Sequence, residues 1–337
     1  MPKRSWLVSI AAVAVLGAAC APLVGDPASA PAPRAGVPRT ADGKPDLQGF
    51  WDAATLTPLE RPREASGQAL SPERAAAIER AAAQRRAQAV RPSDPGRTAP
   101  PVGGVDAAGG VGGYNGFWVD RGTAVTSIQG QARTSLVVDP PDGRVPPLTA
   151  EGHRRVAERR ALVENYDNVE ARPLGERCLM AFGSSGGPPA LPVLYNNIKQ
   201  IVQTPDHVLI LNEMVHDARI VRMRGGHLPP TVRKWLGDSI GRWDGDTLVV
   251  ETTNFTDKTR FRGSGPDLKV TERFTRLDAT TLLYQFTVED PTAWTRPWSG
   301  EYTWAWSDQP VYEYACHEGN YSLEGILKGG RRQDRRP

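Results

Sequence analysis

The stretch TLLYQFTVED, residues 281 to 290, decides the fold class because its side chains alternate with a period of two. The apolar positions on one face of an extended chain are Leu282, Tyr284, Phe286 and Val288. The more polar positions on the opposite face are Leu283, Gln285, Thr287 and Glu289. Alternation of this kind is typical of a β-strand that turns one face toward a core. The stretch therefore predicts a strand and not a helix.

Runs of the same texture follow one another over residues 191–330. They are rich in β-branched and aromatic residues, and the turns TPDH, WDGDT and LDATT separate them by only a few positions. Connections this short join antiparallel strands, whereas parallel strands need longer crossovers. We therefore predict a mainly β protein, with an antiparallel meander that closes into a lipocalin-like barrel or folds into a sandwich, because closure removes exposed strand edges.

Several strands of this meander carry polar residues on both faces. In DTLVVETTNF, residues 246–255, Glu251 and Asn254 fall on opposite faces among valines and threonines. A small closed barrel built from such strands can enclose a partly polar cavity that holds one small ligand. The mixed faces therefore favour ligand binding.

Residues 46–190 predict a helix- and loop-rich N-terminal portion that packs on the barrel. PDLQGFWD, at its start, has the composition of a short first strand. Ser71 followed by Pro72 is a typical helix start, an N-cap and then proline at the first helical position. A second helix begins at Ala150 or at the threonine before it. This portion accounts for the small helical content that we expect.

Three further segments have compositions that do not suit a packed core. Residues 21–45 are rich in proline, alanine and glycine and predict a disordered linker. Residues 91–113 are again rich in proline and glycine and predict a mobile loop. Residues 331–337, RRQDRRP, form a basic tail.

The charge of the whole chain argues against a nucleic-acid partner. The 337 residues include 41 basic and 38 acidic side chains, and the formal net charge is only +3. The two signs are interleaved, so no basic stripe of the kind that binds phosphates is present in the sequence. We therefore expect a small-molecule partner and no nucleic acid.

Residues 1–20 have the pattern of a signal peptide. Two basic residues precede an apolar run of about 14 residues, which is too short to span a bilayer comfortably. Two processing sites compete: LGAAC resembles a lipobox that ends at Cys20, and ASA at residues 28–30 fits a signal peptidase site. The lipobox is our preferred site. We expect an exported lipoprotein of the periplasm or outer membrane, held to the membrane by its lipid alone, or else a secreted soluble protein.

Export makes the remaining cysteines informative. Once Cys20 is acylated or removed, Cys178 and Cys316 are left as an even pair in an oxidising compartment. They form either a disulfide bond, which would close a long loop and stabilise the fold by roughly 4 to 5 kcal/mol, or two buried free thiols.

Long strings in the chain resemble a family of exported bacterial proteins whose function is unassigned. The strings GRWDGDTLVVETTNF and YEYACHEGNY are the most specific, and the resemblance covers nearly everything after residue 45. It implies export and a β-rich domain. It implies no activity, cofactor or catalytic residue.

The string YEYACHEGNY, residues 312–321, is the first candidate site. We expect VYEYAC to be the last strand of the meander, with a break at Gly319. His317 and Glu318 are candidate catalytic residues, since imidazole next to a carboxylate can transfer protons near neutral pH. Asn320 and Tyr321 are candidate ligand contacts. The competing interpretation is a polar strand end with structural hydrogen bonds.

A second candidate site is NEMVHDARI, residues 212–220, at an expected hairpin tip. Glu213 and His216 are candidate acid–base groups, and Arg219 is a candidate for stabilising a developing negative charge. The alternative is that the tip is polar because it faces water. A metal site would need ligands from both candidate sites, and we expect no metal and no cofactor.

Ligand-binding residues are also expected outside these two strings. Trp294 and Trp298 flank an Arg-Pro pair in an expected loop, where exposed indoles suit sugar rings or lipophilic ligands. Four carboxylates would reach the same cavity if their strand faces point inward: Glu251, Glu272, Glu289 and Asp290. Asn254 is included with them.

These observations favour an exported, lipid-anchored β-barrel protein that binds a small organic ligand in a partly polar, aromatic-lined cavity. The alternative is a periplasmic hydrolase, lyase or isomerase that uses a His/Glu acid–base pair. The sequence alone does not decide whether the protein is an enzyme.

Overall fold

The computed structural model describes residues 36–89, 119–181, 187–259 and 261–334. The expected signal peptide, Cys20, the expected mobile loop and most of the expected linker lie outside these ranges. By compactness the chain divides into Met1–Ala32 and Pro33–Pro337, and everything described below belongs to the second unit. Residues 36–45, the end of the expected linker, belong to this second unit. There the side chain of Arg39 donates to Asp246 and to the carbonyl of Gly43.

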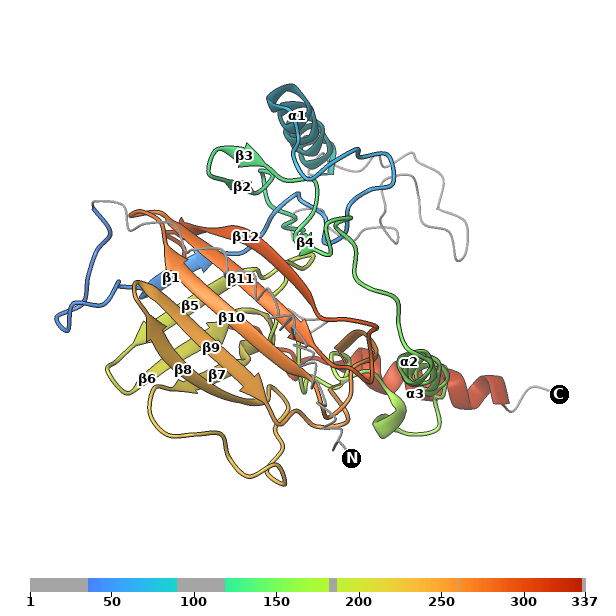
Figure 1. Ribbon diagram of the computed structural model, residues 1–337. Coiled ribbons are helices and arrows are strands. Elements are labelled where there is room, and N and C mark those ends of the chain that lie inside the picture. The colour runs from blue at the N-terminus through green and yellow to red at the C-terminus, as the bar shows by residue number, and fades with distance from the viewer. Residues whose placement is uncertain (1–35, 90–118, 182–186, 260, 335–337) are drawn as a thin grey trace, which may run out of the picture. The chain divides into compact units, whose positions relative to one another are not determined.

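Nine strands of the described chain form a closed barrel (Figure 1). In chain order they are β1 (Gly49–Asp52), β5 (Ile198–Gln203), β6 (His207–Asn212), β7 (Ala218–Arg222), β8 (Asp238–Asp244), β9 (Thr247–Thr253), β10 (Lys269–Arg276), β11 (Thr281–Glu289) and β12 (Trp298–Ser307). Each strand pairs with the next, and β1 pairs with both β5 and β12. The mainly β fold is confirmed, and of the two closures predicted the barrel is the one that forms.

The meander is not antiparallel throughout. Among the described strands, β7 and β8 run parallel, with Val221 opposite Ser239. Two parallel strands start at the same end of the barrel, so the chain must return along the barrel between them. The connection from Arg222 to Asp238 is long enough for this return. The buried carboxylate of Asp238 holds this connection by accepting from the backbone N–H of Leu228 at 3.0 Å and from Arg222 at 2.8 Å. The barrel is therefore mixed.

The N-terminal portion supplies both helices and strands. Its elements are α1 (Pro72–Ala89), β2 (Ser127–Ile128), β3 (Gln131–Ala132), β4 (Val137–Asp139), α2 (Ala150–Val163) and the 3₁₀ turn η2 (Val169–Ala171). Ser71 caps α1, as the sequence predicts, by accepting from the backbone N–H of Arg74, and Thr149 caps α2 by accepting from the backbone N–H of Gly152. The portion packs on the outer wall of β12, where the backbone N–H of Thr303 donates to the hydroxyl of Thr126 at 2.9 Å.

The C-terminal region differs from the prediction. The last barrel strand ends at Ser307, residues 308–320 have no regular strand, and α3 (Tyr321–Asp334) follows. The expectation that VYEYAC is a strand is therefore wrong, although the break at Gly319 is real, since this residue has a φ of +69°. The edge of β12 that faces away from β11 is already paired, with β1 over residues 305–307 and with β4 at Ser299 and Gly300, so this segment has no place in the ladder there. Much of the expected basic tail lies in α3, with Arg331 and Arg332 in its last turn.

Aromatic side chains fill much of the barrel interior. The fully buried ones include Trp51, Phe274, Tyr284, Tyr302 and Trp304. Their rings make stacked and edge-to-face contacts at centroid distances from 4.8 to 6.2 Å, which is the favourable range. The interior is therefore a packed core over much of its length.

A buried ion pair crosses this interior. Both guanidinium nitrogens of Arg219 on β7 contact the carboxylate of Glu272 on β10, and Glu272 is fully buried. The hydroxyl of Tyr284 donates to the same carboxylate at 2.9 Å and itself accepts from the backbone N–H of Ala190 at 2.8 Å. Burial raises the pKa of Tyr284 well above its ordinary value, so the hydroxyl keeps the proton that it donates. The network ties the wall of the barrel to the segment over its end.

We predict that Arg219→Met or Glu272→Met alone lowers the free energy of unfolding by about 3 to 5 kcal/mol, because each leaves a buried charge without its partner. The double variant should lose clearly less than the two single losses combined. Urea unfolding of the four proteins measures this coupling. Strictly additive losses would contradict the assignment of a coupled pair.

Candidate functional site

A lysine lies inside the barrel at one end. Lys199 is on β5, opposite Trp51 of β1 and Asn212 of β6, and its exposed fraction is 0%. It shares the inward face of β5 with the buried Ile201, as the period of two requires. Lysine is among the side chains that are almost never fully buried without a compensating partner. Its position therefore calls for a physical explanation.

Four charged groups set the electrostatics around Lys199. Burial and, to a smaller extent, the positive charge of Arg219 lower the pKa of the ammonium, Glu213, Asp217 and Asp52 raise it, and the net result is a pKa of about 8. Desolvation thus outweighs the three carboxylates. An amine with such a pKa exists in both protonation states close to neutral pH, which is the condition for proton transfer.

The pKa values of the three carboxylates are shifted as well. Burial raises the pKa of Asp52, Glu213 and Asp217, and hydrogen bonds from backbone N–H groups oppose the shift in each case. The donors are Ala54 at 2.8 Å from Asp52, Ile198 at 3.3 Å from Glu213, and Ala181 at 2.8 Å from Asp217. We call Lys199 and these three carboxylates the charged cluster. Perturbed groups that gather in this way are characteristic of functional sites.

Backbone strain gathers at the same end of the barrel. Val215 and His216, in the 3₁₀ turn η3 (Met214–His216) between β6 and β7, have φ values of 59° and 44°. Asn196 and Cys178 also have positive φ, at 56° and 55°. Such conformations are unfavourable for residues with a Cβ, above all for a β-branched valine, and persist where the surroundings enforce them. The backbone of this region is therefore held by its surroundings in conformations that its residues do not favour on their own.

A pocket of about 660 Å³ adjoins the charged cluster. We call it the C-terminal pocket; it is lined by Gly175, Glu176, Tyr195, Asn196, Glu313, Tyr314, Ala315, Cys316, Asn320, Ser322, Leu323 and Ile326. The side chain of Asn196 also hydrogen-bonds to Glu213 of the cluster. Met214 and Val215 pack with Tyr195 and Tyr314 beside it. The pocket wall and the charged cluster are therefore in direct contact.

The predicted catalytic residues are separated into two groups by the structure. Glu213 and Arg219 lie close enough to Lys199 to change its pKa, which Glu213 raises and Arg219 lowers. His317 and Glu318 are exposed, and so is His216 at the hairpin tip. In the described residues no hydrogen bond or ion pair joins His216 or Glu213 to either His317 or Glu318, so the two candidate strings are not linked to one another.

The predicted ligand-binding residues are also distributed over several places. Asn320 lines the C-terminal pocket, where its amide donates to the carbonyl of Glu176 at 3.0 Å. Tyr321 is 81% exposed at the start of α3. Trp294 and Trp298 are buried, in contact with Phe261 of the 3₁₀ turn η4 (Phe261–Gly263). The expectation of exposed indoles is wrong for this pair, because Trp298 begins β12 and faces the core.

The remaining predicted contacts have structural partners away from the pocket. Asp290 is buried and accepts from the backbone N–H of Gly265 at 2.8 Å. Glu251 bonds to Lys269 at 2.7 Å and to His227 at 3.3 Å, and Asn254 donates to the carbonyl of Leu228 at 2.9 Å. Glu289, the last residue of β11, is half-buried. None of the four lines the C-terminal pocket.

The disulfide between Cys178 and Cys316 is present, with a Cα–Cα distance of 5.6 Å. It joins the segment before β5 to the irregular segment after β12. The amide of Asn320 lies 3.4 Å from the Cys178 sulfur. The disulfide therefore holds one wall of the C-terminal pocket against the other.

Sequence reasoning missed Lys199, Asp52 and Asp217. In the run IKQIVQ, each face of the strand carries both polar and apolar residues. The alternation therefore does not say whether Lys199 points inward. A usable signal was present in the chain all the same. A lysine two positions before an isoleucine in a strand shares the face of that isoleucine.

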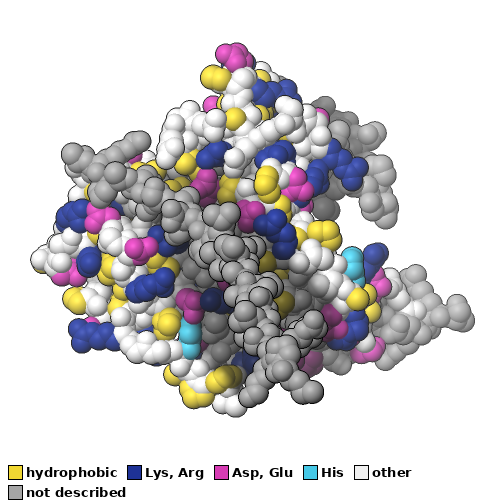
Figure 2. All heavy atoms as spheres, in the orientation of Figure 1, with side chains coloured by type: hydrophobic (Ala, Val, Ile, Leu, Met, Phe, Trp, Pro, Cys, Tyr) yellow, Lys and Arg dark blue, Asp and Glu magenta, His cyan; other side chains and the backbone are white. Residues whose placement is uncertain are grey.

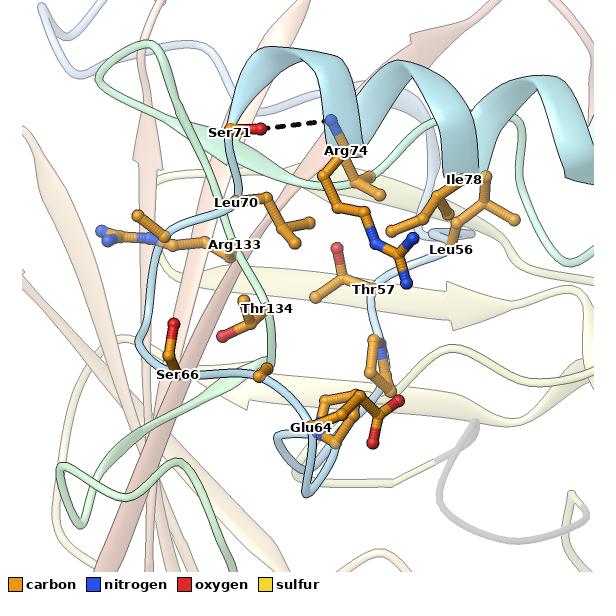
Figure 3. A pocket seen from close by; sticks show the side chains of 15 residues that line it. Leu56, Thr57, Glu64, Ser66, Leu70, Ser71, Arg74, Ile78, Arg133 and Thr134 are labelled. Carbon is orange, nitrogen blue, oxygen red and sulfur yellow. Dashed lines mark hydrogen bonds between the residues drawn. The ribbon is translucent and has the colours of Figure 1, made fainter.

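A second cavity, of about 450 Å³, lies between the start of α1 and two loop segments (Figure 3). Its polar groups are used to hold the N-terminal portion together: Thr57 accepts from the backbone N–H of Thr126, Thr134 donates to the carbonyl of Gly67, and Arg133 pairs with Glu301. None of the predicted site residues lines it. We therefore regard it as a structural cavity.

The described parts of the chain also bear on metal binding, surface charge and membrane insertion. No group of three or more His, Cys, Asp or Glu side chains there is arranged to hold a metal ion. On the face shown in Figure 2, basic and acidic side chains of the described residues are interspersed. Of the described helices, none combines the length and the apolar character needed to cross a bilayer.

The chain matches no family model, and comparisons with curated proteins and with solved structures give no significant match either. The class of protein is therefore defined by the fold and the site alone. It is a closed mixed β-barrel with a charged cluster at one end and an adjoining pocket whose walls are joined by a disulfide.

We predict that Lys199 makes the stability of the protein depend on pH. The pKa is lowered on folding from its ordinary value of 10.5 to about 8, so the unfolded chain binds the proton more tightly and folding is disfavoured at neutral pH. The free energy of unfolding should rise as the pH increases from 8 to 10, by roughly 2 to 3 kcal/mol. Lys199→Met lacks this rise.

Urea unfolding of both proteins at pH 7, 8, 9 and 10 tests the prediction, and the difference between them isolates Lys199 from the tyrosines. Parallel pH curves for the two proteins would refute the assigned shift.

Proposed function

We propose that the protein is an exported, lipid-anchored β-barrel protein that binds a small organic molecule in the C-terminal pocket. The observation that carries the proposal is the contact between this pocket and the charged cluster through Asn196 and Glu213. Binding sites for small molecules combine apolar and aromatic walls with a few placed polar groups. The C-terminal pocket has this composition, and the charged cluster lies behind it.

The packing of the barrel supports a ligand outside the lumen. Tyr284, Tyr302 and Trp304 fill the interior with their own rings. The hydroxyl of Tyr302 also donates to the carbonyl of Ala190 at 2.9 Å, which fixes the segment over that part of the barrel. A ligand in the lumen would have to displace these groups, whereas the C-terminal pocket is already open.

The walls of the pocket are fixed before any ligand binds. The disulfide joins Cys316 to Cys178, and Asn320 bonds to the carbonyl of Glu176. Behind them, Arg172 holds the Glu176 side chain with two hydrogen bonds of 2.9 and 3.2 Å. A pre-organised site loses less conformational entropy on binding. This rigidity favours specific binding of a small molecule.

An acid–base enzyme is the second candidate function, and the charged cluster favours it. In that case Lys199 and Glu213, and not the His317/Glu318 pair, would transfer protons, because their pKa values are shifted toward neutrality. Lys199 is fully buried, however, so a substrate would reach it only after a rearrangement. Ligand binding needs no such rearrangement and is therefore the preferred function.

We predict that Cys20→Ser changes the location of the protein in a bacterial host. The full chain should be recovered with membranes and yield an acylated N-terminal peptide, because a lipid on Cys20 supplies the anchor. The variant should lose the acylated peptide and move to the soluble exported fraction. Fractionation and mass spectrometry measure both. An unmodified wild-type protein that starts after residue 30 would instead establish cleavage at ASA.

We predict that Ala315→Trp abolishes ligand binding, because Ala315 lines the C-terminal pocket and an indole there would occupy its space. A library of small organic compounds, screened against the wild type by saturation-transfer NMR, should yield binders that the variant no longer binds. Ala83→Trp is the matched control, since Ala83 is an exposed residue of α1 that does not line this pocket.

Binders should be retained by the Ala83→Trp protein with unchanged affinity. Equal binding by the wild type and Ala315→Trp, or no binder in the library, would count against the proposed pocket. Near-UV circular dichroism of each variant shows whether its tertiary packing is intact.

A further inference from the structure

The charged residues that line the C-terminal pocket are all acidic. Two of its lining residues, Glu176 and Glu313, are acidic, and none of its lining residues is Lys, Arg or His. Glu213 of the charged cluster lies directly behind Asn196. A negatively charged ligand would therefore find no cationic side chain in the lining, whereas a positively charged one would be attracted by its carboxylates.

The two acidic groups of the pocket differ in what they can offer a ligand. Glu176 is already engaged by the guanidinium of Arg172 through both of its oxygens. For Glu313, which is exposed, the described residues provide no hydrogen bond or ion pair to the carboxylate. Of the two carboxylates, Glu313 is therefore the one that can pair with a charge on a ligand.

Two tyrosines stand on different walls of the same pocket. Tyr314 follows Glu313 in the segment after β12, and Tyr195 belongs to the segment before β5. The faces of tyrosine rings attract cations, and the attraction increases when water is excluded. A ring from each wall together with one carboxylate is an arrangement that recognises an alkylammonium group.

The size and ligand set of the pocket separate an organic cation from a metal ion. A volume of about 660 Å³ suits a small organic molecule. The described residues hold no group of metal-ligating side chains here or elsewhere. Leu323 and Ile326 of α3 add apolar surface to the wall, which favours methyl and methylene groups around the charge.

From this geometry we infer that the ligand of the C-terminal pocket is a small organic cation of the alkylammonium class. The inference rests on the proposed function, because it names the chemistry of the ligand in the same pocket. Glu313 supplies the opposite charge, Tyr195 and Tyr314 contact the cation through their rings, and the apolar side chains of α3 contact its alkyl groups.

Isothermal titration with three probes tests the inference: choline, benzyltrimethylammonium, and 3,3-dimethylbutan-1-ol, which is the neutral isostere of choline. At least one of the cations should bind the wild type, and the neutral alcohol should bind at least five-fold more weakly than choline. Glu313→Gln should weaken cation binding about three- to five-fold and leave the neutral alcohol unchanged. Added salt should weaken cation binding by screening.

Glu318→Gln is the matched control, because it removes a neighbouring exposed carboxylate that does not line the pocket. It should change cation affinity less than two-fold. If neither cation binds, or if the neutral alcohol binds as well as choline and Glu313→Gln has no effect, the inference is wrong. In that event the library binders lost in Ala315→Trp still decide the proposed function separately, since that screen includes neutral and acidic compounds.

Discussion

The pairing of β1 with both β5 and β12 is the interaction on which the rest of the structure depends. Only four residues, Gly49–Asp52, make this closure, and they come from a part of the chain far from the other barrel strands. Because the sheet is closed, every second side chain of each strand points into a confined interior. That interior must be filled, and the large aromatic rings fill it. The same closure brings Asp52 next to the start of β5 and so creates part of the charged cluster.

The barrel interior has an aromatic part and a charged part, and different interactions stabilise them. Around Phe274 and Trp304 the barrel is held by ring packing, which needs no partner groups. Toward Lys199 and Arg219 the inward positions are charged, and burial of charge is unfavourable unless it is compensated. Arg219 is compensated by Glu272, whereas Lys199 relies on carboxylates whose own pKa values burial has raised. Sites where a fold departs from the most stable arrangement are often the functional ones.

Much of the fold could be predicted from the sequence, because alternation and turn residues are local signals. The strand at TLLYQFTVED, the turn LDATT before it and the cap at Ser71 all depend on residues close in sequence. The parallel pairing of β7 and β8 depends on where a long connection leads the chain, which no local pattern records. VYEYAC has the composition of a strand but lies outside the barrel, since β1 and β4 already pair with the outer edge of β12.

The candidate site could be predicted only in part for a related reason. Glu213, Arg219 and Asn320 were found because they stand in short polar strings that attract attention. Lys199 stands in an ordinary strand, and its inward direction follows from its pairing with β1 and β6. Trp294 and Trp298 were placed in an exposed loop because proline and arginine separate them, although ring contacts with Phe261 bury both. Residue type is therefore a sound guide to what a site can do, while strand pairing decides which residues belong to it.

The position of the pocket outside the lumen has a consequence for how binding and stability are related. Residues 308–320 add nothing to the barrel ladder, and their attachment depends on the disulfide and on side-chain bonds such as that from Asn320 to Glu176. The walls of the pocket can therefore differ in side chains without disturbing the aromatic core. The connection between the two regions runs through Asn196 and Glu213 to Lys199. A charged ligand bound in the pocket would act on the charged cluster through this contact, and its binding would then be thermodynamically linked to the protonation of the cluster.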